Sequence, residues 1–138
     1  MCPSQPSVTY IVRPVGPDGE RCGEELYAGD IGLVVWRALH VVLDGGEVQI
    51  AVLPPDWRAR GKPAPGSGDW MRLRPADVVR IGSRQRGRPW VWHKVNAAHA
   101  LADGLFFLGL SRLEWLVLRW RVDGRENLWI LKEGEPCK

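Results

Sequence analysis

The chain has 138 residues, of which 45% are hydrophobic, and a formal net charge of +3. This length and composition are typical of one globular domain, so we expect residues 1–138 to form a single soluble domain without a long disordered tail. No stretch approaches the roughly 20 apolar residues that span a bilayer, and the N-terminus lacks the basic flank and apolar core of a signal peptide; we therefore expect a cytoplasmic protein without a membrane partner.

The first predicted elements are a strand and a turn. Val8 to Val12 is rich in β-forming residues and ends at Pro14, and a turn is predicted at 17–19, where the sequence is Pro-Asp-Gly. Residues 31–38 fit either a strand or a short helix. Apolar residues alternate over 39–43 and again over 48–52, on the two sides of the Asp-Gly-Gly sequence at 44–46. Period two on both sides of a glycine turn predicts a β-hairpin over 39–52.

A glycine- and proline-rich segment follows this hairpin. Residues 60–68 have a composition typical of an exposed, mobile loop, which we place within the single domain. Beyond it, the run from Leu73 to Ile81 is similar to the beginning of a strand in OB-type barrels, with Ala76 where those barrels have glycine. The similarity is confined to this run and identifies no family.

The remaining elements are predicted from alternation and alanine content. Strands at 77–81 and 89–93 flank a very basic segment at 82–88, which predicts a second hairpin. The alanine-rich run 95–103 precedes Gly104 and predicts a short helix that ends there.

The segment 112–122 supports two interpretations. Ser111 to Glu114 fits a capping box and a following helix. Alternation at Leu116, Leu118 and Trp120, together with a turn at 123–124, fits instead a hairpin whose return strand is 128–131, and we favour the hairpin. The predicted fold class is therefore α+β, a mainly antiparallel sheet built from hairpins with one or two short helices, and the sequence shows no internal repeat.

Positive charge is concentrated in the middle of the chain. Residues 1–56 carry a net charge of −5, residues 57–94 a net charge of +8, and residues 95–138 balance. A field of this kind attracts polyanions. Four of the eight tryptophans lie in the basic segment, whereas Trp36, Trp115, Trp120 and Trp129 lie in apolar surroundings and are assigned to packing.

Basic and aromatic side chains together match the needs of a single-stranded nucleic acid. Phosphates are contacted by cations, and unstacked bases gain about 1–3 kcal/mol each by stacking on aromatic rings. We therefore predict a non-catalytic protein that binds single-stranded DNA or RNA with little sequence specificity. The predicted binding residues are Trp57, Arg58, Arg60, Lys62, Trp70, Arg72, Arg74, Arg80, Arg84, Arg86, Arg88, Trp90, Trp92 and Lys94.

Two other interpretations remain at this point. Exposed tryptophan and arginine also dominate protein–protein hot spots, so the chain fits a regulator that docks on a larger complex, and the sequence leaves a homodimer open. Alternatively, Trp90 and Trp92 lie on the two sides of a sheet, one of them in the core, and the arginines are merely solvated.

Motifs of catalysis and metal binding were not found. The sequence has no P-loop, no dinucleotide-binding fingerprint, no nucleophile elbow and no metal-binding histidine motif. The three cysteines, Cys2, Cys22 and Cys137, form no CxxC pair and are predicted to be free thiols. We therefore expect neither an enzyme nor a bound cofactor or metal.

Overall fold

The computed structural model describes residues 8–64 and 67–134, which contain eight strands and three helices. In chain order these are β1 (Thr9–Val15), β2 (Leu26–Ala28), α1 (Ile31–Leu43), β3 (Glu47–Leu53), α2 (Trp57–Arg60), β4 (Met71–Leu73), β5 (Val78–Gln85), β6 (Val91–Asn96), α3 (Ala97–Leu108), β7 (Leu113–Val122) and β8 (Arg125–Lys132). The predicted α+β class with antiparallel strands is confirmed.

The strands form two sheets with the same topology. The strand order is β2-β1-β3-β4 in one sheet and β6-β5-β7-β8 in the other, and neighbouring strands are antiparallel in both. Each sheet comes from one strand–strand–helix–strand–strand unit, which we call the N-terminal half (β1 to β4) and the C-terminal half (β5 to β8). The fold is therefore an internal repeat that is not visible in the residue identities.

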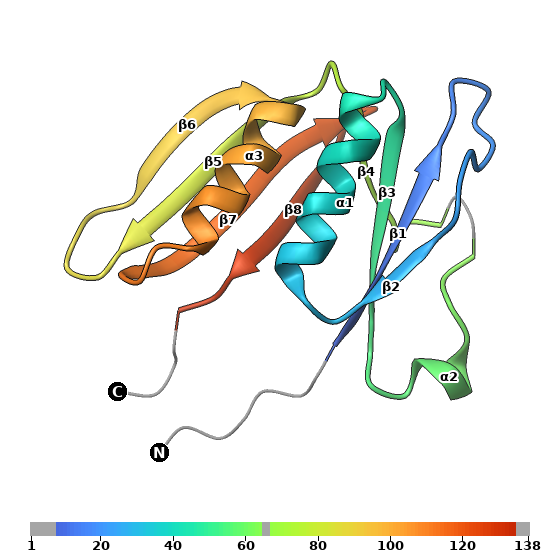
Figure 1. Cartoon of the computed structure of the whole chain (residues 1–138), viewed down its shortest axis with the longest axis horizontal. Helices are drawn as coiled ribbons and strands as arrows, with labels where there is room; N and C mark the ends of the chain where they lie inside the picture. Colours follow the sequence, from blue (N-terminus) through green and yellow to red (C-terminus); the bar gives the residue numbers. More distant parts are fainter. Residues whose placement is uncertain (1–7, 65–66, 135–138) are drawn as a thin grey trace.

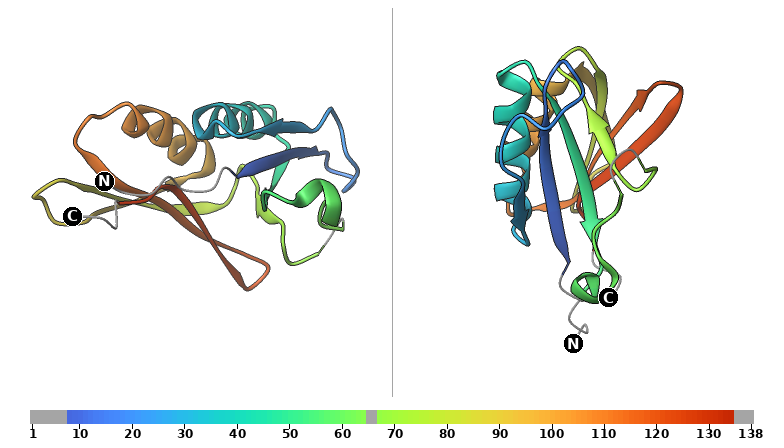
Figure 2. Two further views of the ribbon diagram at one scale, coloured as in Figure 1. Left: turned by 90° about the horizontal axis from the view of Figure 1, so that it is seen from below. Right: turned by 90° about the vertical axis from the view of Figure 1, so that its right-hand side faces the viewer.

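The helices α1 and α3 lie side by side over the same face of the two sheets (Figures 1 and 2). Both begin with a side-chain cap: Asp30 accepts a hydrogen bond of 2.9 Å from the backbone N–H of Gly32, and Asn96 accepts one of 2.8 Å from that of His99. A shared core under the helices combines residues of both halves, such as Val35 and Leu118.

The prediction of a hairpin over 39–52 is wrong in its first strand. Residues 31–43 form α1, whose buried residues Val34, Val35, Ala38, Val41 and Val42 recur at the three- and four-residue spacing of a helix face. The continuous apolar run contains alternation as well, and packing against α3 and the sheets selects the helix. The predicted turn remains, since Gly45 has a φ of +86° just beyond the end of α1.

The predicted helix at 95–103 is also longer than expected. It runs to Leu108, through Gly104, which is buried. A Cβ atom on Gly104 would lie 3.1 Å from the Cδ1 atom of Leu131, so this glycine permits close packing of α3 on β8.

Both hairpins of the C-terminal half are confirmed. Strands β5 and β6 are longer than predicted, and β7 and β8 meet at a turn in which Asp123 and Gly124 have φ values of 52° and 79°. A helix beginning at Ser111 is therefore wrong. The run from Leu73 to Ile81, which is similar to a strand of OB-type barrels, connects the end of β4 to β5. These two strands belong to different four-stranded sheets, so the run does not form part of a barrel.

The N-terminal strand and turn are confirmed with small changes. Strand β1 continues through Pro14 to Val15, and Gly19 in the turn has a φ of +81°. The predicted loop at 60–68 begins at the end of α2, residues 61–64 have no regular structure, and residues 65–66 lie outside the described ranges.

Candidate nucleic-acid interface

The two sheets differ in what covers the face that points away from α1 and α3. In the N-terminal half, the segment around α2 lies on that face (Figure 2). There Ile11, Ala51, Leu53 and Trp70 form a small second core, with Trp57 packed against it. In the C-terminal half, no described helix covers the corresponding face. We call this face the open face.

Strand alternation identifies the residues of the open face. Val79 and Ile81 belong to the core under α3, so their neighbours on β5 point the other way. The residues paired with those neighbours share the face. Its aromatic and charged members are Arg80, Arg84, Trp92, Lys94, Trp115, Arg119, Arg121 and Glu126.

A cluster of three indole rings lies on the open face near the β5–β6 turn. The rings of Trp90 and Trp92 are stacked, with centroids 5.7 Å apart and planes at 17°, and the ring of Trp115 lies 6.0 Å from that of Trp90. Trp90 and Trp92 are 39% and 46% exposed. The interpretation in which one of these two is a core residue is therefore wrong, and their rings are accessible to a base.

Trp92 lies across the neighbouring strand because of Gly82. These residues are paired in the sheet, and a Cβ atom on Gly82 would lie 2.6 Å from two carbon atoms of the indole. The missing side chain lets the ring cover β5. The guanidinium carbon of Arg119 lies 6.0 Å from the centre of the Trp92 ring, so a cation flanks the aromatic cluster.

A row of positive charges crosses three strands next to the indoles. Arg80 is paired in register with Lys94 on β6 and with Arg119 on β7. Like charges placed directly opposite each other are destabilising. Arg119 has an ion pair of 2.6 Å with Glu126, whereas Arg80 and Lys94 have no ion pair with a carboxylate of the described residues. The row therefore leaves positive charge for an outside anion.

Glu126 is held firmly as a carboxylate in this row. Hydrogen bonds from Arg119 and its charge lower the pKa of Glu126, burial opposes them, and the charges of Arg121 and Arg80 lower the pKa further. The ion pair of this carboxylate is with Arg119, and Arg121 and Arg80 act on it through their charges.

Three predicted cations lie at the tip of the β5–β6 hairpin, beside the indoles. Arg84 is half-buried, and its Nε atom donates to the carbonyl of Arg88 at 3.4 Å. Arg86 and Arg88 are exposed next to Gly87, which has a φ of +74°. The structure thus brings together seven predicted residues: Arg80, Arg84, Arg86, Arg88, Trp90, Trp92 and Lys94.

Trp70 is unavailable for binding. Only 4% of it is exposed, and its indole N–H donates to the carbonyl of Ala64 at 3.1 Å. The face of the N-terminal sheet that points away from α1 is apolar at Ile11 and Leu53, and Trp70 packs there in the second core. Its prediction as a stacking residue is wrong.

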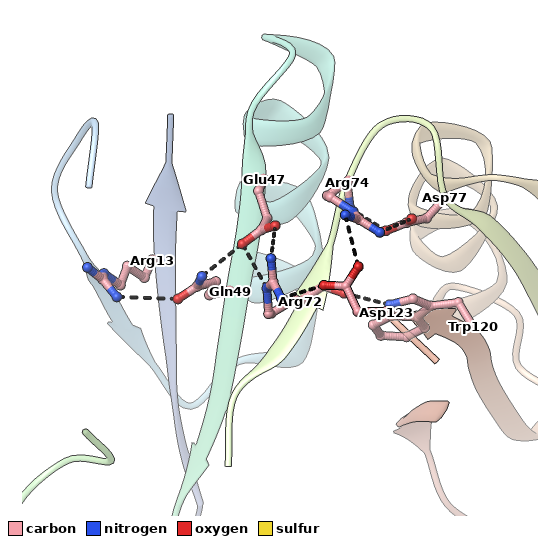
Figure 3. Close-up of polar contacts among 8 residues, drawn as sticks. All are labelled: Arg13, Glu47, Gln49, Arg72, Arg74, Asp77, Trp120 and Asp123. Atoms are coloured by element: carbon pink, nitrogen blue, oxygen red, sulfur yellow. Dashed lines mark hydrogen bonds and ion pairs between the residues drawn. The ribbon is translucent and has the colours of Figure 1, made fainter. Parts of the chain in front are cut away.

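Arg72 and Arg74 are engaged in a network between the two halves (Figure 3). Arg72 donates to both carboxylate oxygens of Glu47 at 2.9 and 3.1 Å and to Asp123 at 3.0 Å. Arg74 donates to Asp77 at 3.3 Å and lies 3.7 Å from Asp123. These two arginines join β4 to β3 and to the β7–β8 turn, so their charges are compensated within the protein.

The other predicted residues lie around α2, in the N-terminal half. Arg60 pairs with Asp56 and Lys62 with Glu25, each at 2.9 Å. The guanidinium carbon of Arg58 lies 5.3 Å from the ring centre of Trp57, which stacks on Tyr27. These residues belong to the N-terminal half, and Arg60 and Lys62 line a pocket together with Leu128 and Ile130 of β8.

The prediction missed three open-face residues on β7. Trp115 was assigned to packing, and Arg119 and Arg121 were overlooked because the segment 95–138 has no net charge. The alternation of β7 carried the missing signal: if Leu116, Leu118 and Trp120 face the core, the residues between them face outward.

The described residues show no group that resembles a metal site. Within 8–64 and 67–134, no three His, Cys, Asp or Glu residues are placed to hold a metal ion, and no helix is long and apolar enough to cross a membrane. Cys22 is free and exposed, while Cys2 and Cys137 lie outside the described ranges.

Comparisons with protein-family models, with curated proteins and with solved structures gave no significant match.

Proposed function

We propose that the chain binds single-stranded nucleic acid on the open face, without catalysis and with little sequence preference. The observation that carries the proposal is an exposed indole cluster on the same sheet face as Arg80 and Lys94, two cations that have no ion pair with a carboxylate of the described residues. Trp90 and Trp92 supply surfaces for base stacking, and Arg80 and Lys94 supply contacts for phosphates.

The order of these groups along the strands fits an extended ligand. Arg80 and Lys94 lie at one end of β5 and β6, Trp92 lies next, and Trp90 and the arginines of the hairpin tip follow. Arg80 and Arg84 lie four residues apart on β5, which is about 13 Å along an extended strand. A nucleic-acid strand laid along β5 and β6 therefore meets cations at both ends and aromatic rings between them.

Single strands are favoured over duplex by the shape of this surface. The bases of a duplex are stacked on one another and present no faces to an indole. Reading a major groove takes a helix or ribbon with polar side chains, and α1 and α3 lie on the other side of the sheets (Figure 2). In α1, Arg37 is the only lysine or arginine.

A fluorescence titration tests this proposal. A polypyrimidine strand should quench the tryptophan emission and bind more tightly than a random-sequence duplex of equal length at the same salt concentration. Equal or tighter binding of the duplex would count against stacking on the open face.

A protein partner is the second candidate, because the same cluster has the composition of a protein–protein hot spot. Tryptophan and arginine are enriched at such sites, and here they are adjacent and exposed. Salt dependence separates the candidates: phosphate contacts on a single strand contribute about 0.7 each to the log–log salt slope. If no oligonucleotide binds at low salt, the docking function becomes the better explanation.

A further inference from the structure

A charged pocket of about 630 Å³ lies at the end of the open face that is distant from the hairpin tip. It is lined by the segment that leads into β5 and by residues of all four strands of the C-terminal sheet. Its charged lining residues are Arg80, Lys94, Arg119, Arg121, Asp77 and Glu126.

Four cations and two carboxylates leave this pocket with an excess of two positive charges. Both carboxylates are already engaged. Asp77 accepts from the backbone N–H of Arg74 at 2.7 Å and from its guanidinium at 3.3 Å, and Glu126 accepts from Arg119. Arg80, Lys94 and Arg121 have no ion pair with a carboxylate of the described residues.

This excess matches a dianion better than a monoanion. A phosphodiester within a strand carries one negative charge, whereas a phosphate monoester carries about −1.5 to −2 at pH 7 and has three acceptor oxygens. Guanidinium groups bind such oxygens in pairs, and three arginines line this pocket.

We propose that this pocket binds a phosphate monoester dianion, namely the terminal phosphate of a strand whose adjacent bases stack on Trp92 and Trp90. The inference rests on the proposed function and adds to it a preference for phosphorylated strand ends. Trp92 lies next to the pocket. Lys94 lines the pocket, and Trp92 points to the same face of β6 two residues away.

The second ionisation of the ligand makes the inference sensitive to pH. A phosphate monoester loses its second negative charge below a pKa of about 6. The charged groups that face the ligand are the four cations, Asp77 and Glu126, and the pKa of Glu126 is lowered below 4.5. His93 is paired with Ile81 and points to the other face of β6, and comparing two strands at each pH removes its contribution.

The experiment compares single strands of one sequence that end in a phosphate or in a hydroxyl, at the 5′ end and at the 3′ end. We expect one phosphorylated strand to bind about tenfold tighter than its hydroxyl counterpart at pH 7.5, as one added charge-assisted hydrogen bond would give. The ratio should fall at pH 5.5, where most of the terminal phosphate is the monoanion. The variant Lys94→Gln should lower the ratio, whereas Arg88→Gln at the tip should weaken both strands equally and keep it.

The outcomes separate this inference from the proposed function. If both strands bind with a ratio near one at pH 7.5, or if Lys94→Gln keeps the ratio while circular dichroism shows an intact fold, the pocket inference is wrong and strand binding stands. If neither strand binds but a nucleoside monophosphate alone quenches the tryptophans, the pocket accepts a small phosphate monoester and the proposed function fails. If none of these ligands binds, both are overturned.

Discussion

The N-terminal and C-terminal halves share a strand order and the position of their helix, and they differ in the use of the opposite sheet face. In the N-terminal half, α2, Trp57 and Trp70 cover this face, and Arg72 is compensated by Glu47 and Asp123. In the C-terminal half, exposed tryptophans occupy it together with Arg80 and Lys94, which have no ion pair with a carboxylate of the described residues. One architecture thus carries a stabilising face in one half and a candidate binding face in the other.

The buried Trp70 of the N-terminal half and the exposed Trp92 of the C-terminal half should differ most strongly in what they contribute to the free energy of unfolding. Trp70→Ala empties the second core and should lower the free energy of unfolding by about 3–5 kcal/mol, as truncation of buried aromatic residues does. Trp92→Ala removes a ring that lies on the surface and should cost less than about 1 kcal/mol. Urea denaturation of both variants measures the difference, and equal losses would show that Trp92 is a packing residue.

A second effect separates the cations of the two halves. Replacing Arg84, Arg86 and Arg88 with alanine should weaken binding of all single strands and flatten the log–log salt slope by about two units, since each phosphate contact contributes about 0.7. The fold should survive, because Arg86 and Arg88 are exposed beside Gly87 in the turn and Arg84 lies near the end of β5.

The matched control replaces the three cations near α2: Arg58, Arg60 and Lys62. This triple variant should keep the affinity and the slope, because two of its residues are paired and all lie in the other half. If the control flattens the slope and the tip variant does not, the binding face has been assigned to the wrong half.

The smallest effect concerns the network that compensates Arg72. Burial alone would raise the pKa of Glu47, but hydrogen bonds from Arg72 and Gln49 and the charges of Arg72 and Arg74 outweigh it, so the pKa is lowered. The ionised form therefore stabilises the fold above the ordinary pKa of 4.5, and this contribution is lost as the pH falls through the lowered value.

The variant Glu47→Gln tests this sign. It should be less stable than the parent protein at pH 7, and the difference should shrink when unfolding is measured below pH 4.5. Glu24→Gln, on an exposed residue with no ion pair among the described residues, should leave the unfolding free energy unchanged at either pH. A difference for Glu47→Gln that grows on acidification would contradict the network.

The sequence predicts the C-terminal half better than the N-terminal half, for a physical reason. In β7, alternation agrees with the Asp123-Gly124 turn, so local and long-range preferences coincide. In α1, the apolar run contains both periods, and only packing against α3 and the sheets selects the helix. The equivalence of the two halves is likewise a property of strand order, which residue identities do not show.

The placement of the candidate site's residues was likewise predictable where their contacts are local in the sequence and not where their partners are distant. Trp90 and Trp92 are close in sequence and were both predicted as binding residues, and their rings stack on each other. The pairing of Arg72 was not predictable, because its partners Glu47 and Asp123 are 25 and 51 residues away in the sequence. The burial of Trp70 depends equally on distant strands, since Ile11 and Leu53 form the surface that it covers.

The most direct test of the open face is the affinity of the Trp90→Ala/Trp92→Ala double variant for a polypyrimidine strand, beside Trp57→Ala as the control in the other half. We expect the double variant to keep its circular dichroism spectrum and to lose about 1–3 kcal/mol of binding free energy for each base that no longer stacks, while the control binds as the parent protein does. Unchanged affinity of a folded double variant would contradict binding on the open face.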